Sequence, residues 1–300
     1  MSSRGPAPRL LMPGERIRAD LDAMFTSLLS APDDQSARLF EAMRYAALGG
    51  KRLRPLLTIA SANLFDVPES HSMWAGLAVE CIHVHSLIHD DLPCMDDDDL
   101  RRGRPTVHCA FDEATAVLAG DALLALAFEI LADPATHPSG EIRAQLIAEL
   151  ARASGASGMA GGQMIDLVAE GSVLDIDGIT RLQRLKTGAL IGWCVEAGAI
   201  LGEAAPELRL SLRGYAQCVG LAFQIADDLL DCRGDESAVG KRLGKDAARG
   251  KATFVTLLGE QRAQRQAELL VEQAVDHLRA FGGSAAQLET IARYAVTRDR

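Results

Sequence analysis

Two groups of aspartate residues in this sequence have a spacing that suggests a chemical function. The first occupies residues 90–96 (DDLPCMD) and the second residues 227–231 (DDLLD), and apolar, helix-forming sequence precedes each. Carboxylates in such surroundings are partly desolvated and repel one another, so they require compensating cations. Aspartate oxygens are the ligands that Mg²⁺ prefers, and protein-bound Mg²⁺ usually completes its shell with water and substrate phosphates. The sequence therefore predicts a magnesium-dependent diphosphate site, with six metal ligands: Asp90, Asp91, Asp96, Asp227, Asp228 and Asp231.

Basic clusters lie close to both aspartate groups in the sequence. Residues 49–55 read GGKRLRP, residues 101–104 read RRGR, and further lysines follow between positions 241 and 251. The whole chain carries 31 basic and 41 acidic residues, a formal net charge of −10. This acidic balance argues against a nonspecific nucleic-acid partner. A polyanionic ligand would therefore need both metal ions and these local basic clusters.

The composition predicts that helices position these residues. The 300 residues are 48% hydrophobic and only 4% aromatic, which favours helices over strands. Gln224, Asp227 and Asp231 are spaced i, i+3 and i+7, so a helix would place them on one face. Breaks between helices are expected at residues 32–34, 66–68, 133–138, 154–158, 202–206 and 234–244. We expect one domain over residues 1–300, with residues 1–14 forming a loose N-terminal arm.

Pro93 interrupts the helix that leads into the first aspartate group. An apolar stripe with alternating three- and four-residue steps predicts that helix, at Trp74, Leu77, Cys81, Val84 and Ile88. Proline lacks an amide donor and clashes with the preceding turn. We therefore expect the helix to end near Asp91 and Asp96 to fold back toward Asp90.

The cysteines and the N-terminal sequence indicate the cellular compartment of the protein. The six cysteines contain no C-x-x-C pair and are expected to be reduced core thiols. The N-terminus lacks a signal-peptide pattern, and no stretch reaches the roughly 18 uninterrupted apolar residues of a membrane span. We expect a cytoplasmic protein with no integral membrane association.

Several separated motifs resemble those of the trans-isoprenyl diphosphate synthase family, in the family's order. They occupy residues 49–55 (GGKRLRP), 90–106 (DDLPCMDDDDLRRGRPT), 161–167 (GGQMIDL), 186–188 (KTG) and 223–231 (FQIADDLLD). Four residues separate the first aspartate pair from Asp96, the form found in bacterial short-chain members. The resemblance covers residues 40–300 approximately and is closest to the bacterial farnesyl diphosphate synthases.

The resemblance implies an all-α isoprenoid synthase bundle, the class I terpenoid synthase fold, around a deep central cavity. It also implies a homodimer and a prenyltransferase that condenses isopentenyl diphosphate with dimethylallyl or geranyl diphosphate. Three Mg²⁺ ions per site, which Mn²⁺ can replace, would stabilise the departing pyrophosphate. The implied catalytic residues are Asp90, Asp96, Asp227, Lys186, Thr187, Gln224 and Lys241. Those implied to bind the substrate diphosphates are Lys51, Arg54, His83, Arg101, Arg102 and Lys251.

Two segments are candidates to close over bound substrate. Residues 234–250 carry Lys241 and Lys245, and the chain ends in Arg298, Asp299 and Arg300. Within the cavity, Thr187 and Gln224 could steady an allylic cation with their oxygen dipoles. Pyrophosphate itself would take the final proton.

Each feature also has a simpler interpretation. Aspartate runs are usually solvated surface, and Asp98 and Asp99 are interpreted that way. A class I terpene cyclase would share the fold, but its second metal motif usually mixes Asn/Asp, Ser/Thr and Glu, unlike DDLLD. A noncatalytic subunit of a heteromeric synthase would be expected to lack one aspartate group or the basic cluster. A general helical metal-binding or scaffold protein is a further alternative.

Product length is predicted from the residues just before Asp90. A growing prenyl chain should descend along this helix, so Ser86 and His85, four and five positions earlier, should set its depth. Related farnesyl synthases commonly carry Tyr or Phe at the fifth position, and geranylgeranyl synthases a smaller or more flexible residue. His85 fits neither pattern. Because an imidazole is far larger than Ala and can be held by hydrogen bonds, a farnesyl product is expected, with geranylgeranyl as the alternative.

Overall fold

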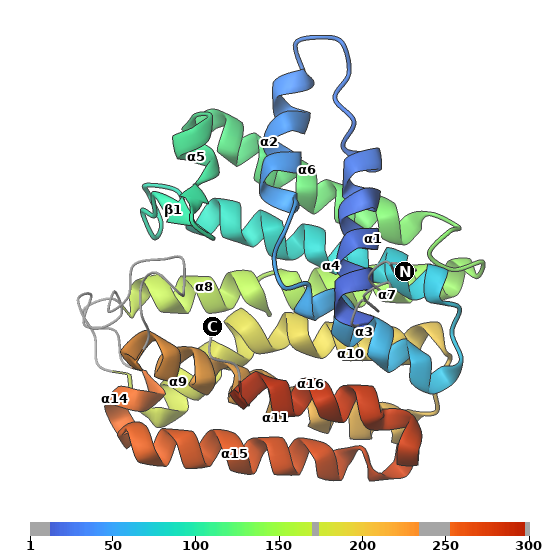
Figure 1. Ribbon diagram of the computed structural model, residues 1–300, viewed down its shortest axis with the longest axis vertical. Helices are drawn as coiled ribbons and strands as arrows, with labels where there is room; N and C mark the ends of the chain where they lie inside the picture. The colour runs from blue at the N-terminus through green and yellow to red at the C-terminus, as the bar shows by residue number, and fades with distance from the viewer. Residues whose placement is uncertain (1–12, 170–173, 234–252, 298–300) are drawn as a thin grey trace, which may run out of the picture.

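Helices form most of the described part of the chain (Figure 1). The computed structural model describes residues 13–169, 174–233 and 253–297. The α-helices are α1 (Pro13–Leu28), α2 (Ala37–Ala47), α3 (Leu53–Ala62), α4 (Glu69–Asp90), α5 (Val107–Ala110), α6 (Glu113–Ala132), α7 (Gly140–Ser154), α8 (Met159–Val168), α9 (Ile176–Gln183), α10 (Ala189–Leu201), α11 (Pro206–Arg233), α14 (Phe254–Leu258), α15 (Glu260–His277) and α16 (Ala286–Thr297). Two short 3₁₀ segments, η1 (Asn63–Phe65) and η3 (Arg279–Ala285), and one π-helical turn, η2 (Arg184–Gly188), complete the helical set. The predicted all-α fold is confirmed.

One short hairpin is the exception within the described part of the chain. Strands β1 (Leu100–Arg101) and β2 (Arg104–Pro105) pair antiparallel, with Arg101 opposite Arg104. A tight turn connects them, in which Arg102 and Gly103 both have positive φ. The hairpin directly follows the first aspartate group, so the arginines of the hairpin are held close to those aspartates.

Two helices form the centre of the bundle. Almost every residue of α10 is buried, and α4 is buried along most of its length. A helix that is apolar on all sides belongs in a core. α4 packs against α3 and α6, whereas α10 packs against α3, α7 and α11. α15 covers α11 as an outer layer, at the lower edge of Figure 1.

Helix α6 is unusually apolar for a helix at the surface. By length and composition it could cross a membrane, since it has 20 residues and an 18-residue window within it has a mean hydropathy of 1.8. In the bundle one side of α6 packs against α4, α2 and α7. The opposite side leaves Val117 and Leu118 exposed, at 41% and 57%.

The helix breaks agree with the sequence, with small shifts. The five breaks predicted between residues 32 and 206 each separate consecutive helical segments, and the sixth, at residues 234–244, lies outside the described residues. α1 begins at Pro13, so the last two residues of the predicted N-terminal arm are helical. Proline is favoured in the first turn of a helix, where its missing amide hydrogen would have no partner.

The prediction of six core thiols is only partly right. All six cysteines are free, and Cys81 and Cys194 are buried. Three others are exposed: Cys94, Cys109 and Cys232. They lie in the loop after α4, on the short α5 and near the end of α11, where apolar neighbours in sequence do not imply burial.

Candidate active site

The first aspartate group lies where α4 ends. Asp90 is the last residue of α4, and the backbone amide of Asp96 donates to the Asp90 carbonyl at 2.8 Å. The amide of Asp98 donates to the Asp91 carbonyl at 3.2 Å. These bonds confirm that the chain folds back after Pro93, as expected of a residue that cannot continue the helix.

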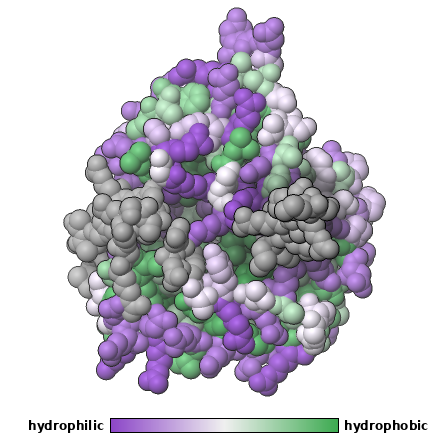
Figure 2. All heavy atoms as spheres, viewed as in Figure 1, coloured by the Kyte–Doolittle hydropathy of each residue, from purple (hydrophilic) through white to green (hydrophobic). Residues whose placement is uncertain are grey.

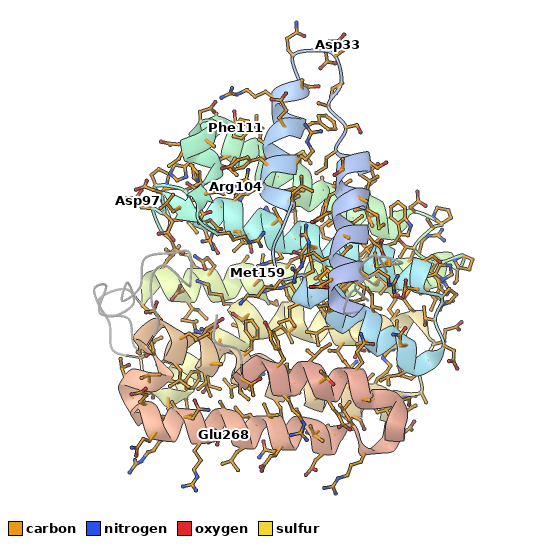
Figure 3. The ribbon with its side chains drawn as sticks, in the orientation of Figure 1. Asp33, Asp97, Arg104, Phe111, Met159 and Glu268 are labelled. Atoms are coloured by element: carbon orange, nitrogen blue, oxygen red, sulfur yellow. The ribbon has the colours of Figure 1, made fainter. Side chains whose placement is uncertain are left out.

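A cavity of about 450 Å³ opens beside Asp90, between α4, α8 and the π-helical turn η2. Met159, on its wall, lies near the middle of the molecule (Figure 3). We call this space the central cavity. Seven of the predicted site residues line it: Arg54, His83, His85, Ser86, Asp90, Lys186 and Thr187.

Asp90 has an unfavourable electrostatic position. The pKa of its carboxyl is raised to about 6, because burial and the nearby charge of Asp96 outweigh the opposing effect of Lys186. A carboxylate that is both desolvated and near another carboxylate gains from a bound cation. The residues present therefore fit a hard divalent metal such as Mg²⁺.

Lys186 connects the two sides of the central cavity. Its ammonium group forms an ion pair with Asp166 of α8 at 2.6 Å. Burial alone would lower the Lys186 pKa, but Asp166, Asp90 and Asp96 raise it above its ordinary value. The lysine is therefore a charged donor directed at the first aspartate group. It lies in a π-helical turn, a geometry found frequently at functional sites.

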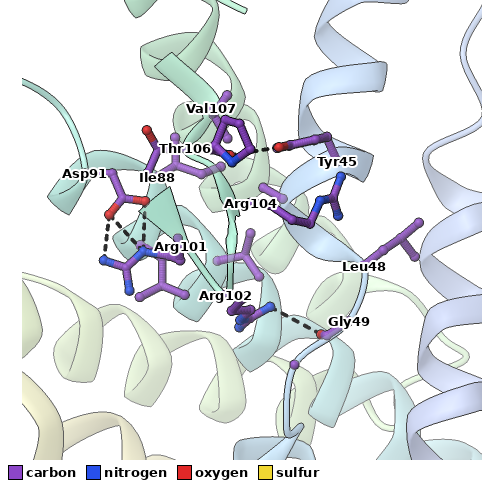
Figure 4. Close-up of a pocket in the computed structure, with 15 residues that line it drawn as sticks. Tyr45, Leu48, Gly49, Ile88, Asp91, Arg101, Arg102, Arg104, Thr106 and Val107 are labelled. Atoms are coloured by element: carbon purple, nitrogen blue, oxygen red, sulfur yellow. Dashed lines mark hydrogen bonds and ion pairs between the residues drawn. The ribbon is translucent and has the colours of Figure 1, made fainter. Parts of the chain in front are cut away.

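Asp91 and Arg101 hold each other in place. The Arg101 guanidinium donates to both Asp91 carboxylate oxygens, with the shortest contact at 2.6 Å (Figure 4). Asp91 is 3% exposed. This pair anchors the β1–β2 hairpin to the end of α4 and occupies both carboxylate oxygens of Asp91, so Asp90 and Asp96 are the better placed carboxylates for a metal.

The predicted basic pocket gathers around His83. Burial and the nearby charges of Arg54 and Arg102 lower the His83 pKa well below its ordinary value, so the imidazole is neutral. Arg102 donates to the Gly49 carbonyl at 3.3 Å (Figure 4). Gly50 has φ of 93°, a left-handed conformation that favours glycine, and a Cβ there would lie 2.7 Å from the Arg102 guanidinium. Lys51 follows Gly50 and is exposed.

The second aspartate group lies on α11, and hydrogen bonds connect it to Thr187 of η2, which lines the central cavity. The Thr187 hydroxyl donates to the Gln224 side-chain oxygen at 3.3 Å, which brings these two predicted residues together. The Gln224 amide donates to Asp228 at 3.0 Å. Asp228 also accepts from the Phe254 backbone amide at 3.0 Å, so it ties α11 to α14. The metal-binding roles of Asp227, Asp228 and Asp231 stay predictions.

Other predicted residues divide into two sets. Lys241, Lys245, Lys251 and residues 298–300 lie outside the described residues. Asp98, interpreted as solvated, is instead buried at 9% exposure, 3.9 Å from Arg101. The hairpin folds over Asp98, which the charge run alone did not reveal. Asp99 is exposed, as expected.

The sequence did not predict a role for two residues of the site. Gln163 lines the central cavity at 9% exposure, and neither atom of its side-chain amide has a hydrogen-bond partner among the described residues. Asp166, one turn further along α8, holds Lys186. A polar pair spaced i, i+3 within the otherwise apolar segment 159–168 is the signal that could have found both.

Two histidines of α4, His85 and His89, also line the central cavity. His85 Nδ1 donates to the Gly120 carbonyl of α6 at 3.0 Å, and His89 Nε2 donates to the Val117 carbonyl at 3.1 Å. Burial, with His89 nearby, lowers the His85 pKa to about 4, so His85 is neutral. The two rings meet edge to face at 4.6 Å. His85 is therefore fixed in position, as a residue that limits cavity depth should be.

The chain is similar to prenyl synthases in sequence and in structure. Residues 36–283 match the family model described as polyprenyl synthetase. Farnesyl diphosphate synthase of Escherichia coli is 47% identical over 273 residues, covering 89% of this chain and 91% of that protein. Geranylgeranyl pyrophosphate synthase 11 of Arabidopsis thaliana is 45% identical over 278 residues, covering 90% and 77%. The crystal structure of an FPP/GFPP synthase from Zymomonas mobilis is 55% identical, with a TM-score of 0.88 and coverage of 94% and 97%.

Proposed function

This chain belongs to the polyprenyl synthetase family, and we propose that it makes farnesyl diphosphate from isopentenyl diphosphate and an allylic diphosphate. It is a prenyltransferase, and its substrates are isoprenyl diphosphates. The observation that carries the farnesyl assignment is the central cavity, which Asp90, Lys186 and His85 all line, with His85 held by its hydrogen bond to Gly120. Bacterial farnesyl synthases are also among its relatives at 41–47% identity.

The residues around Asp90 would hold the allylic diphosphate. A divalent metal, which we propose is Mg²⁺ with three ions per site, supplies positive charge to the departing pyrophosphate. Asp90, Asp96 and the α11 aspartates would hold it. Lys186 is charged and lies near Asp90 and Asp96, so it can donate directly to a diphosphate oxygen.

Isopentenyl diphosphate would bind in the basic pocket. Arg54 and Arg102 provide charge, and the neutral His83 provides a hydrogen-bond donor between them. The carbon–oxygen bond of the allylic diphosphate breaks, the isopentenyl alkene bonds to the resulting cation, and pyrophosphate removes the proton that the adduct loses. Thr187 and Gln224 present oxygen atoms to the cation. The apolar cavity excludes water that would quench it.

Two further proposals concern the whole protein. The exposed apolar side of α6, at Val117 and Leu118, supports a homodimer in which this face meets its copy. Six free thiols are compatible with a reducing compartment, and we propose that the protein is cytoplasmic.

Pyrophosphate release tests the proposed reaction. Each substrate is supplied alone and then both together, with Mg²⁺ and after chelation with EDTA. A synthase releases pyrophosphate rapidly only when geranyl and isopentenyl diphosphate are both present, and chelation abolishes release. A terpene cyclase would release pyrophosphate from the allylic substrate alone. No release with both substrates would contradict the proposal and leave a noncatalytic subunit.

A geranylgeranyl product is the second candidate. It is favoured by the 45% identity to the plant geranylgeranyl synthase and by the absence of a phenol or phenyl ring at position 85. The hydrogen bond from His85 to Gly120 weighs against it, because a fixed imidazole keeps the cavity short.

A further inference from the structure

A second group of metal-binding side chains lies outside the diphosphate site. Asp99, His108 and Cys109 offer a carboxylate oxygen, an imidazole nitrogen and a sulfur, all within 4.8 Å of one another. In the part of the chain that the structure describes, these residues form the one group of three such donors at this spacing. Asp99 precedes β1, and the other two lie on α5 after β2, so the group joins both ends of the hairpin.

The distances within this group match those of a tetrahedral metal site. Cys109 Sγ lies 3.4 Å from His108 Nε2 and 3.6 Å from Asp99 Oδ1. In tetrahedral zinc sites, bonds of about 2.3 Å to sulfur and about 2.0 Å to nitrogen or oxygen place such ligands about 3.5 Å apart. The three donors therefore need little movement to share one ion.

Thr106 orients the imidazole from the opposite side. Its hydroxyl lies 3.1 Å from His108 Nδ1, and Thr106 is 2% exposed. When Nδ1 carries the proton and donates to this hydroxyl, Nε2 keeps its lone pair toward Cys109. The Thr106 amide also donates to the Asp99 carbonyl at 2.9 Å, which fixes the backbone at the base of the hairpin. A hydrogen-bonded outer partner of this kind is typical of metal-binding histidines.

We propose that Asp99, His108 and Cys109 bind one zinc-type divalent cation, with water in the fourth position. Thiolate and imidazole ligands select such ions over Mg²⁺, which prefers oxygen. On binding, a metal–sulfur bond forms and the Cys109 thiol releases its proton to water. Two of the donors are exposed at the surface, so an ion can reach them directly.

The expected consequence is a clamp on the hairpin. The bound ion connects the chain before β1 to the chain after β2, and between them lie Arg101, which holds Asp91, and Arg102, which holds Gly49. The ion therefore stabilises the hairpin without contacting the diphosphate site. Its binding is independent of the proposed reaction and is measured without substrate.

Cobalt titration of the full-length protein tests the proposal. Co²⁺ is added in the presence of excess Mg²⁺, which occupies the aspartate sites. We expect one equivalent to give a thiolate-to-cobalt charge-transfer band together with the strong visible absorption of tetrahedral Co²⁺, and Zn²⁺ to displace it.

Substitutions identify the ligands. Cys109→Ser should abolish the charge-transfer band, whereas Cys94→Ser and Cys232→Ser, which remove the other two exposed thiols, should leave it unchanged. Thr106→Val should weaken Co²⁺ binding about 10- to 100-fold, since the outer partner is lost. Zn²⁺ should raise the melting temperature of the wild type but not of Cys109→Ser. No charge-transfer band in the wild type, or a band that survives in Cys109→Ser, would overturn the proposal.

Discussion

At Asp90, burial in an apolar environment disfavours the negative charge of the carboxylate. Its carboxyl is desolvated at the end of an apolar helix and lies near Asp96, so its pKa rises to about 6. The folded protein therefore binds the Asp90 proton more tightly than the unfolded chain does. As the pH rises from about 4 to about 6, ionisation of Asp90 lowers the stability of the metal-free protein. A bound cation offsets this loss of stability. The Asp90 carboxylate therefore destabilises the metal-free protein but is well suited to bind a metal ion.

Replacing Asp90 separates these two effects. At pH 7 without divalent metal, Asp90→Asn should stabilise the protein by about 1–3 kcal/mol, because the buried charge is removed. Turnover with Mg²⁺ should fall by about 100-fold or more, because a transition-state charge contact is lost. Melting curves and steady-state assays measure both. The control is Asp97→Asn, which removes the same charge from an exposed loop residue and should change neither. Full activity in a folded Asp90→Asn enzyme would exclude the proposed metal site.

At the scale of elements, the sequence predicted the helices and the return of the chain after Pro93, but not the π-helical turn. Periodicity and proline chemistry are local, so α4 and its ending could be predicted from the sequence. The turn that carries Lys186 depends on contact between distant segments. A Cβ on Gly162 of α8 would lie 2.2 Å from the Lys186 backbone nitrogen. A local sequence pattern cannot predict a contact between two helical segments that are distant in the sequence.

Gly162→Ala tests that contact. The added methyl group must push η2 away from α8, so we expect a loss of about 1–3 kcal/mol in stability. Turnover should fall further than stability explains, because Lys186 moves relative to Asp90. Gly192→Ala is the matched control, since a Cβ there meets nothing within 4 Å on a helix of the same core. Measured kcat equal to wild type in Gly162→Ala would mean that the position of η2 does not limit the reaction.

Residues of α4 that line the central cavity should determine its depth. His85→Ala should lengthen the product beyond fifteen carbons, because the imidazole fixed to Gly120 no longer closes the cavity. Ser86→Phe should shorten it toward geranyl diphosphate, because the ring fills the same space one residue nearer the aspartates. Mass spectrometry of the products measures both changes. His71→Ala, at the opposite end of α4, is the control. An unchanged product distribution in His85→Ala would place the end of the cavity elsewhere.

At the scale of the whole molecule, helix α6 has an apolar side that the described residues leave uncovered. α6 carries Val117 and Leu118 on its exposed side, although its other side is part of the core. The view in Figure 2 shows hydrophilic side chains over the upper and lower ends of the molecule, typical of a solvated surface. The sequence could predict a dimer only by resemblance. An apolar helix has the same sequence pattern whether its own chain or a second copy covers it.

Leu118→Glu tests the dimer. A charge on the shared face should shift the protein to monomers in analytical ultracentrifugation, because an unpaired carboxylate is costly to bury at an interface. Leu210→Glu, at a leucine of α11 that is 69% exposed, should leave the assembly unchanged. A Leu118→Glu protein that sediments like the wild type would show that α6 is not the interface.

The measurement that tests the central claim most directly is the chain length of the wild-type product. The enzyme is incubated with isopentenyl diphosphate, geranyl diphosphate and Mg²⁺, and the dephosphorylated products are identified by mass spectrometry. The cavity between Asp90 and His85 predicts a fifteen-carbon farnesyl product as the main species. A mainly twenty-carbon product, or a cyclised hydrocarbon with no linear prenyl diphosphate, would contradict this account.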